Sequence, residues 1–162
     1  MGCGSRTEKD ISYGNPCFEN VTRLDLNPDH KPDVVWDLRV HPLPFKDEEF
    51  EEIHCYEVLE HLAYQGDYEF FFKEFTEYAR ILKPNGRFFG SVPNGAWTWG
   101  DPSHKRAIQK ETLTFLDQSN YTQVGETAMS DFRGIYKADM RLIYCQEADR
   151  LYFVLEKFAG EA

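Results

Sequence analysis

The sequence lacks the long apolar segments and the paired cysteines that mark several large classes of protein. No apolar run approaches the roughly 20 residues that cross a bilayer, and the first residues, MGCGSR, contain no apolar core of a secretory signal. The four cysteines, Cys3, Cys17, Cys55 and Cys145, lie far apart and form no CxxC pair. This spacing argues against a cysteine zinc site and against a disulfide framework. We therefore expect a cytoplasmic protein, not associated with membranes, whose thiols are mostly free.

Positive charge is also scarce. The chain has 18 basic and 28 acidic residues, and its formal net charge is −10. Proteins that bind nucleic acid usually carry a basic surface that displaces counterions from the phosphates. The charge balance therefore favours a small-molecule or protein ligand over nucleic acid. Whether the chain forms a homo-oligomer stays open at this stage.

What the sequence does contain is typical of one folded domain. Hydrophobic residues make up 41% of the chain and aromatic residues 15%, which is an ordinary globular composition. A length of 162 residues suits a single domain with one substantial core. We therefore expect one domain over residues 1–162.

Apolar periodicity predicts alternating strands and helices. A helix is expected over 67–82, where apolar residues recur at i, i+3, i+4 and i+7, with Glu74 and Glu77 on the opposite, solvent-facing side. A shorter helix is expected over 110–118, with Leu113 and Leu116 facing inward. Short apolar runs between turn residues predict strands at 21–26, 34–36, 50–56, 87–92, 140–145 and 151–156.

The order of these elements predicts the class of fold. Alternating strands and helices favour an α/β protein of three layers, with a mainly parallel, Rossmann-like sheet covered on both faces. The last two strands are too close in sequence for a crossover, so they must form an antiparallel hairpin. Ligands of such sheets bind at the carboxyl ends of the strands.

Three features, two of them at predicted strand ends, suit a nucleoside ligand. Gly2-Cys3-Gly4 is a turn over which a ligand can approach the backbone closely. Asp25 lies 21 residues after Gly4, at the end of the strand predicted over 21–26, which is the place for an acid that accepts both hydroxyls of a ribose. Asp37 follows the next strand and could accept a hydrogen bond from an amine such as N6 of adenine. The alternative interpretations are a flexible terminus, a plain turn acid and a cap.

These features belong to a longer series of motifs. The series, within residues 1–94, resembles in order and spacing the type 11 family of class I S-adenosylmethionine-dependent methyltransferases. The motifs are Gly2-Cys3-Gly4, Leu24-Asp25-Leu26-Asn27-Pro28, Asp37-Leu38, Leu43-Pro44-Phe45, Phe50-Glu51-Glu52-Ile53, Glu57-Val58-Leu59-Glu60-His61 and Leu82-Lys83-Pro84-Asn85-Gly86-Arg87-Phe88.

The resemblance implies a methyltransferase fold, S-adenosylmethionine as cofactor, and methyl transfer to a small-molecule or sugar-type acceptor. The cofactor-binding residues it implies are Gly2, Cys3, Gly4, Asp25, Leu26, Asp37, Leu38 and Tyr56, with Glu57 bordering the methyl donor as a candidate catalytic residue. The family has an apolar strand before the glycine turn, whereas only Met1 precedes Gly2 here. We therefore expect a shortened N-terminus, and a non-catalytic cofactor-binding or interaction domain is the alternative function.

Two loops, 94–108 and 121–138, correspond to the side of the family fold that binds the acceptor. Trp97 and Trp99 in the first loop suit a flat or apolar acceptor, or else cap the core. His104 in the same loop is the candidate acceptor-side base, with an ordinary surface histidine as the alternative.

A metal site is a further expectation. Glu57, Glu60 and His61 stand at i, i+3 and i+4, so they would share one face if the chain is helical there. Two carboxylates and an imidazole suit a divalent cation, with His104 as a fourth ligand. The arrangement is similar to that of magnesium-dependent small-RNA 2′-O-methyltransferases, and this resemblance implies Mg²⁺. The alternative is that His61 is a hydrogen-bonded structural residue.

Overall fold

A computed structural model describes residues 1–5, 11 and 20–159. Of the helices in this part of the chain, none has both the length and the apolar character needed to cross a membrane. Short 3-10 turns separate several of the main elements. Those elements are β1 (Leu24–Asp25), β2 (Val34–Val35), β3 (Phe50–Tyr56), α1 (Tyr68–Ile81), β4 (Leu82–Pro93), α2 (Lys110–Leu113), β5 (Met140–Glu147) and β6 (Arg150–Lys157).

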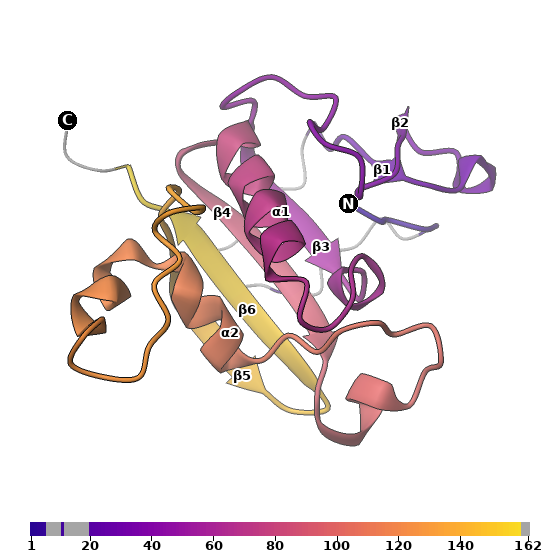
Figure 1. Ribbon diagram of the computed structural model, residues 1–162. Helices are drawn as coiled ribbons and strands as arrows, with labels where there is room; N and C mark the ends of the chain where they lie inside the picture. Colours follow the sequence, from indigo (N-terminus) through magenta and orange to yellow (C-terminus); the bar gives the residue numbers. More distant parts are fainter. Residues whose placement is uncertain (6–10, 12–19, 160–162) are drawn as a thin grey trace.

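The main sheet has four strands in the order β3-β4-β6-β5 (Figure 1). Strands β3 and β4 are parallel, and β6 runs antiparallel to both β4 and β5. The predicted α/β fold with an antiparallel C-terminal hairpin is therefore confirmed. The hairpin strands are longer than predicted and leave only Ala148 and Asp149 between them. Strands β1 and β2 form a separate parallel pair.

The first residues of the chain connect these two sheets. The Met1 nitrogen donates to the His54 carbonyl oxygen of β3 at 2.6 Å, and the Cys3 amide donates to the Leu24 carbonyl oxygen of β1 at 3.2 Å. Residues 1–3 therefore lie between β1 and β3. They bring the glycine turn next to the carboxyl end of β1, where Asp25 lies.

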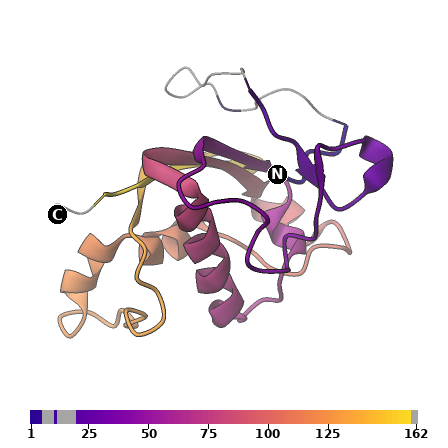
Figure 2. The same ribbon diagram turned by 90° about the horizontal axis from the view of Figure 1, so that it is seen from above.

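Both α1 and α2 pack against the same face of the sheet (Figure 2). The largest apolar cluster lies on this face, where α1 contributes Phe72 and Phe75 and the sheet contributes Phe88 and Phe153. On the opposite face Ile11 packs with aromatic and aliphatic side chains of β4 and β6. The second helical layer that the sequence predicted is not formed by any helix within 20–159, and most of the polar stretch 7–16 lies outside the described residues.

Helix α1 begins and ends close to the predicted limits. The Asp67 side chain caps it by accepting a hydrogen bond from the Phe70 amide at 3.1 Å. The prediction that Glu74 and Glu77 face solvent is wrong, because they are 0% and 9% exposed. Periodicity could not show that each of these carboxylates has a buried or half-buried arginine partner.

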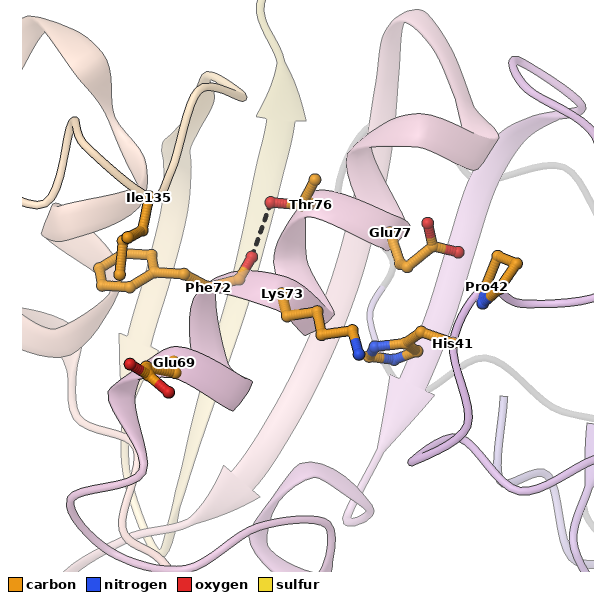
Figure 3. Close-up of a pocket in the computed structure, with 8 residues that line it drawn as sticks. All are labelled: His41, Pro42, Glu69, Phe72, Lys73, Thr76, Glu77 and Ile135. Carbon is orange, nitrogen blue, oxygen red and sulfur yellow. Dashed lines mark hydrogen bonds between the residues drawn. The ribbon is translucent and has the colours of Figure 1, made fainter.

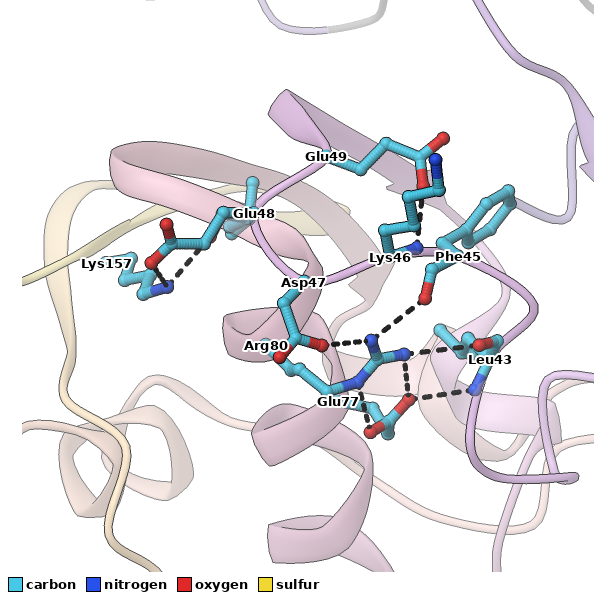
Figure 4. A network of polar contacts seen from close by, with 10 residues as sticks. Leu43, Phe45, Lys46, Asp47, Glu48, Glu49, Glu77, Arg80 and Lys157 are labelled. Carbon is cyan, nitrogen blue, oxygen red and sulfur yellow. Dashed lines mark hydrogen bonds and ion pairs between the residues drawn. The ribbon is translucent and has the colours of Figure 1, made fainter.

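The pair of Glu77 and Arg80 holds the segment Leu43-Pro44-Phe45 in place (Figure 4). Glu77 accepts hydrogen bonds from the Leu43 amide and from Arg80, both at 2.8 Å. Arg80 in turn donates to the Phe45 carbonyl oxygen at 2.9 Å and to Asp47 at 2.7 Å. Burial alone would raise the pKa of Glu77, but the hydrogen bonds from Arg80 and Leu43 outweigh it and lower that pKa. The segment is thus fastened to α1 by polar contacts.

The second partnership is a buried ion pair between α1 and the loop after β4. Arg106 donates to Glu74 at 2.7 Å, and the two side chains are 5% and 0% exposed. Arg106 also donates to the Leu59 carbonyl oxygen at 2.7 Å. One residue further, the Glu60 carbonyl oxygen accepts from the Lys105 amide at 2.8 Å. The ion pair therefore holds residues 104–106 against the turn that contains Glu60.

The close contact between β4 and β6 gives a first test of the fold. Gly90 pairs with Phe153 across the strands, and a Cβ at position 90 would overlap the Phe153 ring. We expect Gly90→Ala to lower the free energy of unfolding by about 1–3 kcal/mol in urea denaturation. Gly134→Ala is the control, because no atom lies within 4 Å of its Cβ position. Equal stability of the two variants would contradict this packing.

Removing one partner of the buried Glu74–Arg106 ion pair tests its contribution to stability. Arg106→Met leaves a buried carboxylate without its counter-charge, so we expect a loss of about 3–5 kcal/mol in unfolding free energy. The double variant Glu74→Leu/Arg106→Met should recover most of it. Arg133→Met removes an exposed pair with Asp131 and should cost less than about 1 kcal/mol. If the Arg106→Met variant were as stable as the Arg133→Met variant, the buried ion pair would not have this role.

Candidate functional site

The glycine turn and Asp25 meet, as the sequence predicted. The Gly4 amide donates to Asp25 Oδ2 at 2.7 Å, and the Asn27 amide donates to Oδ1 at 2.9 Å. Gly2 and Gly4 have φ angles of 58° and 50°, a conformation that other residues rarely adopt. A Cβ on Gly2 would also overlap the Val58 side chain. The close approach therefore requires glycine at position 2, and the positive φ favours glycine at position 4.

The Asp25 carboxylate retains the capacity to accept further hydrogen bonds. A carboxylate has about four acceptor sites, and each Asp25 oxygen uses one on a backbone amide. The residue is 9% exposed, and the neighbouring Leu26 is 58% exposed. A ligand with paired hydroxyls thus fits the chemistry of this position. Burial raises the pKa of the nearby Cys3 thiol, which keeps it protonated at neutral pH.

Asp37 has a partner that the sequence reasoning missed. Arg39 contacts both carboxylate oxygens, with Nε to Oδ1 at 2.9 Å and Nη2 to Oδ2 at 2.7 Å. Hydrogen bonds from the Arg39 side chain lower the pKa of Asp37, although burial opposes them. Leu38 between them is buried in the core. An adenine amine at Asp37 would therefore share the carboxylate with a guanidinium.

Tyr56 and Glu57 end β3 with their side chains already engaged. The Tyr56 hydroxyl is 2.6 Å from His54 Nδ1, and the ring packs on the sheet face away from α1. Glu57 accepts from the Ser91 hydroxyl at 2.9 Å and pairs with Arg150 at 3.1 Å. Both contacts direct the Glu57 carboxylate toward β4 and β6.

The expected four-residue metal set is therefore corrected to three residues. Glu57 has a φ of 56°, and the turn after it, Leu59–His61, is a 3-10 turn. The helical spacing that placed Glu57 beside Glu60 and His61 does not apply to such a backbone. The group that converges consists of Glu60, His61 and His104, each with one ligand atom within 4.8 Å of the others.

Glu60 lies at the centre of this cluster. Its Oε1 is 3.7 Å from His61 Nε2 and 4.0 Å from His104 Nε2. The side chain is 2% exposed, and neither carboxylate oxygen has a hydrogen-bond partner among the described residues. Burial raises the pKa of Glu60 to about 7. The two imidazole rings stand edge to face, with centroids 4.9 Å apart.

Backbone carbonyl groups fix the orientation of both imidazoles. His104 Nδ1 lies 2.9 Å from the Thr98 carbonyl oxygen, and His61 Nδ1 lies 3.3 Å from the Ser103 carbonyl oxygen. A carbonyl oxygen only accepts, so Nδ1 bears a proton in each ring, and in the neutral ring Nε2 offers a lone pair. Both lone pairs are on the atoms nearest to Glu60. The sequence spacing indicated Glu60, His61 and His104, but it could not reveal these tautomers.

The aromatic residues next to this cluster are exposed. Trp97 and Trp99 are 65% and 57% exposed on the 3-10 helix Gly95–Trp99. They do not cap the core, so the interpretation as an accessible aromatic surface is the one that agrees with the structure. The Thr98 carbonyl between them binds His104, which ties this surface to the cluster.

A separate hollow of about 500 Å³ lies beside α1 (Figure 3). None of the predicted cofactor or metal residues lines it. Burial lowers the pKa of His41 at its rim. Its lining residues are His41, Pro42, Glu69, Phe72, Lys73, Thr76, Glu77 and Ile135. The hollow is therefore distinct from the strand ends at which Asp25 and Glu60 lie.

The thiols agree with the prediction where they are described. Cys3, Cys55 and Cys145 are free, and Cys17 lies outside the described residues. Burial raises the pKa of Cys55 to about 12, so its thiolate is not available near neutral pH.

Comparison with known proteins identifies the family. A family model described as a methyltransferase domain matches residues 1–90, which is more than half of the chain. No curated protein matches the sequence. Among solved structures, an S-adenosylmethionine-dependent methyltransferase from Archaeoglobus fulgidus is similar, with a TM-score of 0.53 and 15% identity, over 83% of this chain and 74% of that one.

A second similar structure is a complex of the Trm112 methyltransferase activator with a protein described as a methyltransferase, from Haloferax volcanii. Its TM-score is 0.50 at 15% identity, over 84% of this chain and 71% of that one. At these identities the structural matches support the fold, and the family model supports the assignment. The chain therefore belongs to the type 11 methyltransferase-domain family of S-adenosylmethionine-dependent methyltransferases.

Proposed function

We propose that the protein transfers a methyl group from S-adenosylmethionine to a small-molecule or sugar-type acceptor. The observation that supports this most directly is the hydrogen bond from Gly4 to Asp25, which joins the glycine turn to an acid at the end of β1. The net charge of −10 favours such an acceptor over a nucleic acid.

Residues at the ends of β1 and β2 would hold the cofactor. The backbone of Gly2 to Gly4 would lie under its methionine portion, and Asp25 would accept its ribose hydroxyls, with Leu26 alongside. Asp37 and the Leu38 backbone would bind the adenine. When bound, S-adenosylmethionine supplies an electrophilic methyl group on a sulfonium. The free acceptor sites on Asp25 support this assignment.

The remaining role of the protein is to orient the acceptor. Holding two reactants in line can supply much of the reduction in barrier. While no cation occupies the cluster, His104 Nε2 has a free lone pair, so His104 is the stronger candidate for an acceptor-side base. Glu57 is less suited to that role, because Arg150 and Ser91 already engage its carboxylate. Trp97 and Trp99 provide exposed rings on which a flat or sugar-like acceptor could stack.

One observation favours the alternative of a non-catalytic domain. Arg39 covers both oxygens of Asp37, and this competition would weaken cofactor binding. The structure does not support the expected Mg²⁺, because two imidazoles and one carboxylate are a poor donor set for an ion that takes oxygen ligands.

Titration calorimetry distinguishes a methyltransferase from an interaction domain that binds no cofactor. We expect S-adenosylmethionine and S-adenosylhomocysteine each to bind at one site with a micromolar dissociation constant, as an enzyme with a complete cofactor site requires. Absence of binding at millimolar concentrations of both would reject the methyltransferase function and favour the non-catalytic domain.

The role of Asp25 is tested by Asp25→Asn. Exchanging its charged acceptor for a neutral amide should weaken binding of S-adenosylhomocysteine about ten-fold or more, because a hydrogen bond to a charged group contributes about 1.5–3 kcal/mol. Asp29→Asn, which alters an exposed acid of the following turn, is the matched control and should bind like the wild type. Equal affinities of the two variants would exclude Asp25 from the site.

A further inference from the structure

We propose that Glu60, His61 and His104 bind a divalent transition-metal ion of the Zn²⁺ and Co²⁺ class. The site is the expected four-residue set without Glu57, and its donor atoms suit a different class of ion. It depends on the geometry of the cluster and on no step of methyl transfer.

The first argument is the balance of charge. Both imidazoles have their Nδ1 proton directed at a carbonyl oxygen, so their Nε2 lone pairs point toward the Glu60 carboxylate. Three acceptor groups thus converge, and the described residues donate no hydrogen bond to Glu60. Burying an ionised carboxylate without a partner is costly. A positive charge in the middle of the cluster removes this cost.

The second argument is distance. Separations of 3.7 and 4.0 Å between Glu60 Oε1 and the two Nε2 atoms are too long for hydrogen bonds. Two ligand atoms bound to the same tetrahedral zinc lie about 3.4 Å apart, given bonds of about 2.0–2.1 Å. Small side-chain movements would therefore bring all three atoms to bonding distance of one ion.

The third argument is the outer shell. Histidine ligands of metals typically donate their second ring N–H to a carbonyl or carboxylate, which fixes the ring and raises its basicity. The Thr98 and Ser103 carbonyl groups have this role here. The Ser103 hydroxyl, which donates to Asp101 at 2.6 Å, also lies 3.2 Å from His61 Nδ1. Both rings are thus oriented before any ion binds.

The donor set decides the class of ion. Imidazole nitrogen suits Zn²⁺, Co²⁺ and similar ions, whereas Mg²⁺ takes oxygen ligands. Three protein ligands leave a coordination position open, as in catalytic zinc sites. His61 is the most exposed member at 36%, so this position is accessible from its side. A water molecule or an oxygen of the acceptor could occupy it.

Co²⁺ is the probe, because its absorption bands report the coordinating atoms. Tag-free protein, treated with a chelator and then dialysed, is titrated with Co²⁺ and afterwards with Zn²⁺ or Mg²⁺. We expect one equivalent of Co²⁺ to produce visible bands, one equivalent of Zn²⁺ to abolish them, and excess Mg²⁺ to leave them unchanged. No bands at millimolar Co²⁺, or displacement by Mg²⁺ as readily as by Zn²⁺, would overturn the proposal.

Variants locate the ion. Glu60→Gln keeps the shape of the side chain, and His104→Ala removes one ring; each should weaken Co²⁺ binding at least ten-fold. His30→Ala, which changes a histidine that contacts Ser5 outside the cluster, should leave binding unchanged. Circular dichroism shows whether each variant is folded, and His61→Ala replaces either cluster variant that is not. Wild-type affinity in folded cluster variants, or a loss in His30→Ala, would place the ion elsewhere.

Discussion

The buried ion pair between Glu74 and Arg106 is the contact on which the arrangement of the site depends. It joins the middle of α1 to the loop after β4, and through Arg106 it reaches the Leu59 carbonyl oxygen. The adjacent backbone bond between Lys105 and Glu60 holds His104 close to Glu60. The ion pair thus helps to bring together residues that are more than 40 positions apart in the sequence. Buried pairs of this kind often add little net stability but fix one geometry.

A second set of contacts forms the part of the site that would hold the cofactor. Residues 1–3 lie between β1 and β3, and Gly2 packs on Val58, two residues before Glu60. The glycine turn therefore lies close to the cluster of Glu60, His61 and His104, because Val58 and Glu60 belong to the same short segment of chain. This proximity is what a methyltransferase needs, because the methyl donor and the acceptor must meet at the carboxyl ends of adjacent strands.

Much of this architecture could be predicted from the sequence, for identifiable reasons. Strand β3 and helix α1 have strong periodic patterns, and both were predicted nearly to the residue. The link between the glycine turn and Asp25 followed from spacing. The errors concern side chains whose tertiary contacts the pattern does not show: Glu74 pairs with Arg106 of a distant loop, and Glu77 accepts from the Leu43 amide as well as from Arg80 on its own helix.

The candidate site shows the same limit. Helical spacing suggested that Glu57 would join Glu60, yet a left-handed backbone at Glu57 directs it to Arg150 instead. Similarly, Asp37 was assigned from its position after a strand, with no indication that Arg39 would cover it. Hydrophobic periodicity does not indicate which partner a charged residue takes, whether that partner is distant, like Arg150, or two residues away, like Arg39.

The central claim is that the cofactor lies across the ends of β1 and β2. The most direct measurement is a ¹⁵N–¹H correlation spectrum of the labelled protein during titration with S-adenosylhomocysteine. The account predicts the largest shifts at the amides of Gly4, Asn27 and Arg39, which surround Asp25 and Asp37. Shifts confined to residues around the hollow beside α1, such as His41 and Lys73, with those three amides unchanged, would contradict it.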